Sequence, residues 1–130
     1  MTNFDRYRLL VGAYFLFGGM AGAAFLWRIV VEGGSPVTEE VYGPWVYRIP
    51  AWFWCVFQML SGWVAAFGAL TGRRWVVAIG GACFVADMAF LAAAGYLAGG
   101  TGAVLHLNAT FFIGPISALM VVFCYGGGNE

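Results

Sequence analysis

Charge is the scarcest property of this 130-residue chain. Charged residues make up 9% of the sequence, six basic residues balance six acidic ones, and there is no run of basic residues. Proteins that bind nucleic acid present a basic patch to a polyanion, so this composition excludes that class. A soluble surface is excluded as well, because 62% of the residues are hydrophobic and the mean hydropathy is +0.84.

Residues that carry catalytic chemistry are also few. The chain has one histidine, and its three cysteines form no CxxC pair, which argues against a disulfide-exchange enzyme and a disulfide framework. The sequence contains no GxSxG, HExxH or P-loop motif, the patterns typical of serine hydrolases, zinc proteases and nucleotide-binding enzymes. We therefore assign no catalytic residue and no metal site from the sequence.

In contrast to charged and catalytic residues, long apolar stretches are abundant in the sequence. A helix of about 20 residues spans the roughly 30 Å hydrocarbon core of a bilayer and satisfies its own backbone there. We expect residues 1–130 to form one all-α domain, an up-down four-helix membrane bundle. Its helices are expected over about 9–31, 51–70, 75–97 and 103–125, with one long loop, 32–50. The other two connections are short, which makes the helices they join antiparallel.

The arginines predict the orientation of this bundle. Arg6 and Arg8 precede the first helix, and Arg73 and Arg74 lie in the turn between the second and third helices. Basic residues collect on the cytoplasmic side of membrane proteins, so both termini are expected in the cytoplasm. Loop 32–50 is then expected on the outer side.

Small residues recur at the spacing of close helix contacts. Such residues let two backbones approach, and they either close the bundle internally or dock it onto other subunits. The positions assigned to packing are Gly18, Gly22, Gly62 and Gly114. Pro115 lies within the last apolar stretch and lacks a backbone donor, so we expect a kink there and a freed carbonyl near Phe111.

Asp87 is the one charged residue deep inside an expected membrane helix. Counting about 1.5 Å per residue places it at the same depth as Gln58 on the neighbouring antiparallel helix, so we expect a hydrogen bond between them. Two interpretations of this buried polar pair stay open. It is either a polar clamp that fixes the register of the two helices, or a site for proton relay or ligand binding.

A second polar group is expected near the outer surface. His106 and Asn108 begin the last helix, and Arg28 reaches a similar depth at the end of the first. A single imidazole can serve as one axial ligand of a haem shared with a partner, or as the ligand of a chlorophyll-type magnesium. The alternative is an interfacial histidine bonded to loop or water. These three residues are the candidate cofactor-binding group.

The second and third apolar stretches resemble a known family. The hairpin from Gly62 to Gly81, in which residues 66–74 read Ala-Phe-Gly-Ala-Leu-Thr-Gly-Arg-Arg, resembles small DoxX-like four-helix bacterial membrane proteins. The resemblance implies the bacterial cytoplasmic membrane and redox-associated biology. It carries over no functional residue.

Two functional classes fit these observations. The first is a non-catalytic accessory subunit of a larger energy-transducing or redox membrane complex, packed against other membrane subunits and in contact with quinone, haem, pigment or lipid. The second is a small stand-alone membrane enzyme or carrier for a lipophilic substrate, acting through Asp87 and Gln58 or through the Arg28, His106 and Asn108 group. The lack of any complete catalytic set favours the first class.

Overall fold

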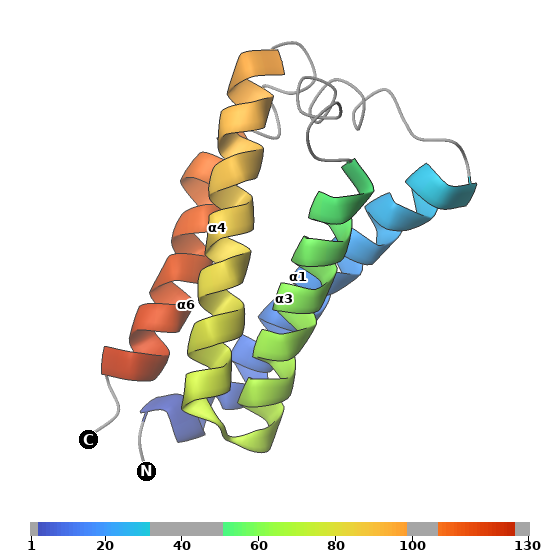
Figure 1. Cartoon of the computed structure of the whole chain (residues 1–130). Helices are drawn as coiled ribbons and strands as arrows, with labels where there is room; N and C mark the ends of the chain where they lie inside the picture. The colour runs from blue at the N-terminus through green and yellow to red at the C-terminus, as the bar shows by residue number, and fades with distance from the viewer. Residues whose placement is uncertain (1–2, 32–50, 99–106, 127–130) are drawn as a thin grey trace.

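The computed structural model describes residues 3–31, 51–98 and 107–126, and every element in these ranges is helical (Figure 1). The elements are α1 (Asn3–Val31), α3 (Ala51–Thr71), α4 (Arg74–Ala98) and the π-helix η1 (Ala109–Ile113), which continues into α6 (Gly114–Gly126). Helices α1, α3 and α4 are long and apolar enough to cross a membrane, whereas the apolar stretch Ala109–Val122 is shorter. The predicted all-α architecture with four helices is confirmed, and loop 32–50 lies outside the described residues.

The helices pack in chain order. Helix α1 packs on α3, α3 on α4, and α4 on α6, whereas α1 and α6 touch only sparsely. The N-terminus, the C-terminus and the α3–α4 turn lie at the same end of the molecule, as an up-down arrangement requires (Figure 1). The side of the bundle between α1 and α6 is therefore less completely closed than the others.

The turn between α3 and α4 is set by Gly72. This residue has φ of +76°, a left-handed conformation that glycine adopts without the strain of a Cβ atom. The Gly72 N–H donates to the Ala69 carbonyl at 3.3 Å, and the Arg73 N–H donates to the Gly68 carbonyl at 2.7 Å. This pair of bonds is a Schellman motif, which satisfies the last carbonyls of α3 and lets α4 start immediately.

Small residues bring α1 and α3 into close contact inside the bundle. A Cβ atom on Gly62 would lie 2.7 Å from the Gly19 nitrogen and 2.8 Å from the Phe15 carbonyl oxygen. A Cβ atom on Gly22 would lie 2.8 Å from the Met59 nitrogen, and one on Gly18 would meet the Phe84 ring. These glycines therefore serve internal packing, which answers the question that the sequence left open. The fourth packing candidate, Gly114, contacts the Ala109 carbonyl of its own segment.

Aromatic side chains fill the space next to these contacts. Phe15 and Phe84 are almost completely buried, and their rings meet edge to face with centroids 5.6 Å apart. The rest of the buried hydrophobic cluster is contributed by α1, α3 and α4, and it consists of Phe4, Val11, Ala65, Ala66, Ala69, Val77 and Met88. The core thus follows the α1–α3–α4 junction along most of its length.

The four arginines that predicted the orientation, Arg6, Arg8, Arg73 and Arg74, lie at one end of the bundle, near the start of α1 and the α3–α4 turn. Arg8 reaches the α3–α4 turn, since its Nη1 would lie 3.1 Å from a Cβ atom on Gly72. The Arg74 guanidinium lies over the Phe4 ring, 5.6 Å from the centroid, a cation–π contact between the starts of α4 and α1. The predicted grouping of basic residues at this end is present in the fold.

Candidate functional site

A cavity of about 120 Å³ lies between α1, α3, α4 and η1. Helix α1 contributes Gly18 and Phe25 to its wall, α4 contributes Phe84 and Met88, and η1 contributes Ala109 at its start. The cavity lies in the half of the bundle away from the α3–α4 turn. Its wall is mostly apolar, so the few polar groups at its edge decide what it can hold.

Two carboxamide side chains reach this cavity, Gln58 from α3 and Asn108 from the residue before η1. Gln58 is 6% exposed, and its Nε2 donates to the Gly18 carbonyl oxygen at 3.0 Å. The Ser61 hydroxyl donates to the Gln58 carbonyl at 3.1 Å. Gln58 is thus fixed against α1, and it links α1 to α3 at the point where their backbones are close.

Asp87 lies on α4 between the cavity-lining residues Phe84 and Met88 but does not itself line the cavity. It is 0% exposed, and neither carboxyl oxygen forms a hydrogen bond with any described residue. The predicted hydrogen bond to Gln58 is not formed, because the Gln58 amide group turns toward α1. Two residues at the same depth in a membrane face each other only if their helices are rotated so that both side chains point toward the shared interface. In this structure the Gln58 amide group points toward α1 instead of toward Asp87.

The α3–α4 interface around Asp87 contains a second unsatisfied group. The Trp54 ring stacks on Phe90 with centroids 3.8 Å apart and planes 11° apart. The buried Trp54 Nε1–H has no hydrogen-bond acceptor among the described residues. Cys55, the next residue on α3, is a buried free thiol. A buried acceptor and a buried donor without partners thus occur on the same interface.

The last helix begins with a π-helical turn in which the Gly114 N–H donates to the Ala109 carbonyl. Such turns are rare and frequently accompany functional sites. The turn ends just before Pro115, the residue for which the sequence predicted a kink and a freed carbonyl near Phe111. In this segment, the Ile113 carbonyl accepts hydrogen bonds from side chains.

Two hydroxyl groups converge on the Ile113 carbonyl oxygen. The Tyr14 hydroxyl lies 2.9 Å from it and Ser117 Oγ 2.6 Å from it, and the two hydroxyls are 2.7 Å apart. Each hydroxyl has one proton, so at most two of these three contacts carry a hydrogen atom at once. This cluster joins α1 to α6 across the side of the bundle that is otherwise poorly closed.

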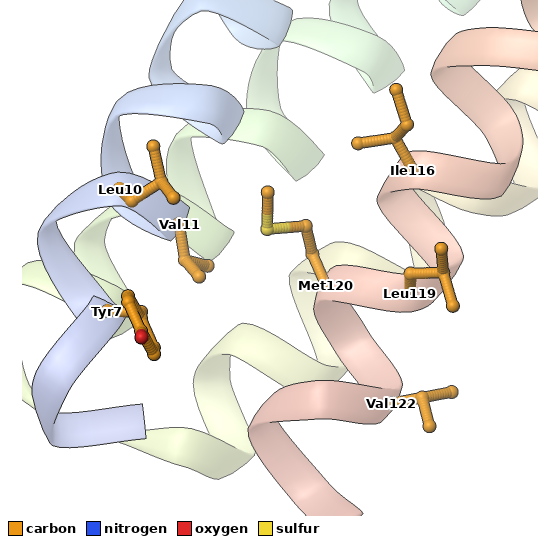
Figure 2. Close-up of a pocket in the computed structure, with 7 residues that line it drawn as sticks. All are labelled: Tyr7, Leu10, Val11, Ile116, Leu119, Met120 and Val122. Carbon is orange, nitrogen blue, oxygen red and sulfur yellow. The ribbon is translucent and has the colours of Figure 1, made fainter. Parts of the chain in front are cut away.

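A groove of about 680 Å³ separates α1 and α6 on the arginine side of that cluster. Tyr7, Leu10 and Val11 form one wall, and Ile116, Leu119, Met120 and Val122 form the other. Figure 2 shows Met120 extending from α6 toward α1 between the two walls. The groove is almost wholly apolar, and nothing in the sequence patterns pointed to it.

The second predicted polar group is only partly assembled in the structure. Asn108 lines the interior cavity, where it joins Gln58, a pairing that the sequence did not predict. Arg28 is exposed in the last turn of α1, and His106 lies outside the described residues. Within residues 3–31, 51–98 and 107–126, no three potential metal-binding side chains come together.

Comparison of the chain with protein-family models, with curated proteins and with solved structures finds no match. The resemblance of the 62–81 hairpin to DoxX-like proteins therefore stays a prediction.

Proposed function

We propose that this chain is a non-catalytic accessory subunit of an integral membrane complex, and that one transmembrane helix of a partner subunit occupies the α1–α6 groove. The observation that supports the proposal is the groove itself. In a bilayer, exposed apolar side chains alone do not drive helices to associate, because lipid tails are as apolar as leucine. Close packing between the helices drives their association instead. A concave, apolar surface between two helices is the kind of surface into which the ridge of a further helix packs.

The size of the groove fits such a partner. Its walls cover residues 7–11 of α1 and 116–122 of α6, which is about 6 to 9 Å along the axes at about 1.5 Å per residue, or between one and two helical turns. The Tyr14, Ser117 and Ile113 cluster ties α1 to α6 beyond one end of the groove. The groove is thus preformed, and it has room for several apolar side chains from one face of a partner helix.

A matched pair of substitutions tests this proposal. Leu9 and Leu10 are adjacent on α1 and similarly exposed, at 68% and 60%, but only Leu10 lines the groove. We expect Leu10→Trp to reduce the amount of partner that co-purifies in mild detergent by about ten-fold or more, since overpacking costs about 1 to 3 kcal/mol. Leu9→Trp should leave the recovery unchanged.

A photo-reactive side chain at Leu119, on the opposite wall, identifies the occupant in the same membranes. Support requires that the cross-linked peptide be a transmembrane segment of the co-purifying subunit and that Leu10→Trp abolish the adduct. If Leu119 cross-links only to lipid, or if the two tryptophan variants behave alike, the partner-helix proposal is wrong. The carrier or enzyme acting near Asp87, Gln58 and Asn108 then becomes the better interpretation.

The orientation in the bacterial cytoplasmic membrane is part of the same proposal, with the arginine end and both termini in the cytoplasm. Thr71 and Val31 are exposed at opposite ends of the bundle. After the native cysteines have been replaced by alanine, an impermeant thiol reagent added to intact cells should label Val31→Cys and miss Thr71→Cys. Labelling of Thr71→Cys alone would invert the orientation.

A further inference from the structure

Asp87 occupies the centre of the bundle in a setting that does not suit a charge. It lies 13 residues from Arg74 and 11 from Ala98, the ends of α4, or roughly 16 to 20 Å from each end at about 1.5 Å per residue. It is completely buried and accepts no hydrogen bond from any residue that the structure describes. An unpaired carboxylate there would cost several kcal/mol of desolvation.

No described element that packs against α4 offers a compensating charge. Helix α3 presents the Cys55 thiol, and the Tyr14 hydroxyl of α1 is held by Ser117 of α6. The other charged side chains in the described ranges lie near helix ends or in the α3–α4 turn, namely Asp5, Arg6, Arg8, Arg28, Arg73 and Arg74. Among the described residues, the surroundings of this carboxyl group therefore favour the neutral acid over the carboxylate.

The packing of the fold does not require a carboxyl group at this position. A buried polar group without a partner costs about 1 to 3 kcal/mol, whereas an apolar side chain of similar volume would avoid that cost. Buried polar groups that lower the stability of a fold are characteristic of functional positions. Carboxyl groups inside membrane-spanning helices mark proton and ion pathways. A chemical role thus accounts for Asp87 better than a structural one.

The cavity next to Asp87 is the nearest described space that could hold water. Phe84, one turn before Asp87, and Met88, the residue after it, form part of the cavity wall. Gln58 and Asn108 line the same cavity, whose volume of about 120 Å³ leaves room for water, and these carboxamides supply the polar partners that a buried water needs.

We propose that Asp87 is a reversible proton-binding site in the centre of the bundle. The carboxylic acid is the form that the closed bundle holds. When water in the cavity reaches the carboxyl group, its O–H bond breaks, the proton passes to water and the carboxylate stays behind; protonation by hydronium restores the acid. This site belongs to the chain alone, so it does not depend on the partner helix proposed above.

Infrared spectroscopy of the full chain in lipid nanodiscs tests the proposal. At neutral pH the protein should show the C=O band of a protonated carboxyl group, shifted in D₂O, that is absent in Asp87→Asn and retained in Asp5→Asn. Raising the pH should remove the band and lowering the pH should restore it, with constant helical circular dichroism. A native protein without the band at neutral pH would overturn the proposal, as would a band lost only when the helices unfold.

Chemical labelling of the native chain keeps the proposal testable if Asp87→Asn does not fold. Dicyclohexylcarbodiimide enters lipid and adds to a protonated carboxyl group, giving an O-acylisourea that rearranges to a stable N-acylurea. Peptide mapping at neutral pH should find this adduct on Asp87, whereas a water-soluble carbodiimide should leave Asp87 unmodified. No adduct on Asp87 with the lipid-soluble reagent would contradict the proposal.

Discussion

Replacing Gly62 by alanine is expected to destabilise the bundle by about 1 to 3 kcal/mol, the usual cost of overpacking. The added methyl group would lie 2.7 to 2.8 Å from backbone atoms of Gly19 and Phe15. A backbone cannot rotate away as a side chain can, so α1 and α3 must separate. The free energy of unfolding, measured by titrating nanodisc or micelle samples with a denaturing detergent, reports the loss.

Gly12→Ala is the matched control for this result. A Cβ atom on Gly12 would meet only side-chain atoms of Leu70 and Ala69, the nearest at 3.2 Å. Alanine is also favoured over glycine inside a helix by about 0.5 to 1 kcal/mol. The stability of Gly12→Ala should therefore be close to that of the native chain or slightly higher. Equal losses at Gly12 and Gly62 would show that the α1–α3 contact is not as close as described.

Replacing Phe84 by alanine is expected to cost about 3 kcal/mol, the lower end of the range for buried phenylalanines in soluble cores. The ring packs on Gly18, meets the Phe15 ring edge to face and forms part of the cavity wall. The lower end applies because lipid solvates an apolar side chain when the bundle separates, so packing is lost without a large transfer term.

Phe67 provides the comparison for Phe84. It is 59% exposed, and its replacement by alanine removes a ring of the same size from the surface of α3. The same denaturing-detergent titration should find a loss well under 1 kcal/mol for Phe67→Ala. If both alanine variants lost similar stability, the interior position of Phe84 would not be what makes it important.

The helices could be predicted from hydropathy, but their ends could not. The second and third were expected over 51–70 and 75–97 and are found over Ala51–Thr71 and Arg74–Ala98. The first was expected to begin at residue 9 but begins at Asn3. Hydropathy reports where a segment becomes apolar, whereas a helix continues through polar residues as long as its backbone bonds are favourable.

The hydrogen-bond partners of buried side chains were harder to predict. A single sequence indicates how deep a residue lies in the membrane, but not how its helix is rotated about its own axis. Gln58 and Asp87 share a depth, yet Gln58 bonds to the Gly18 carbonyl and leaves Asp87 alone. Asn108 was grouped with Arg28 at the surface; it is exposed, and it also borders the cavity that Gln58 lines. Which way a side chain faces around its helix depends on how all the helices pack together.

The π-helical turn that precedes α6 also sets a register. A π turn contains one residue more than an α turn over the same rise, so η1 holds a residue that an uninterrupted α-helix would not accommodate. Deleting one residue between Ala109 and Ile113 should therefore turn this segment into a regular α-helix and leave Asn108 and Ser117 on the sides that they face now. In a segment that was α-helical throughout, the same additional residue would instead rotate one flank relative to the other by about 100° around the helix axis. The π turn thus keeps Asn108 at the cavity and Ser117 beside Tyr14 in spite of the additional residue.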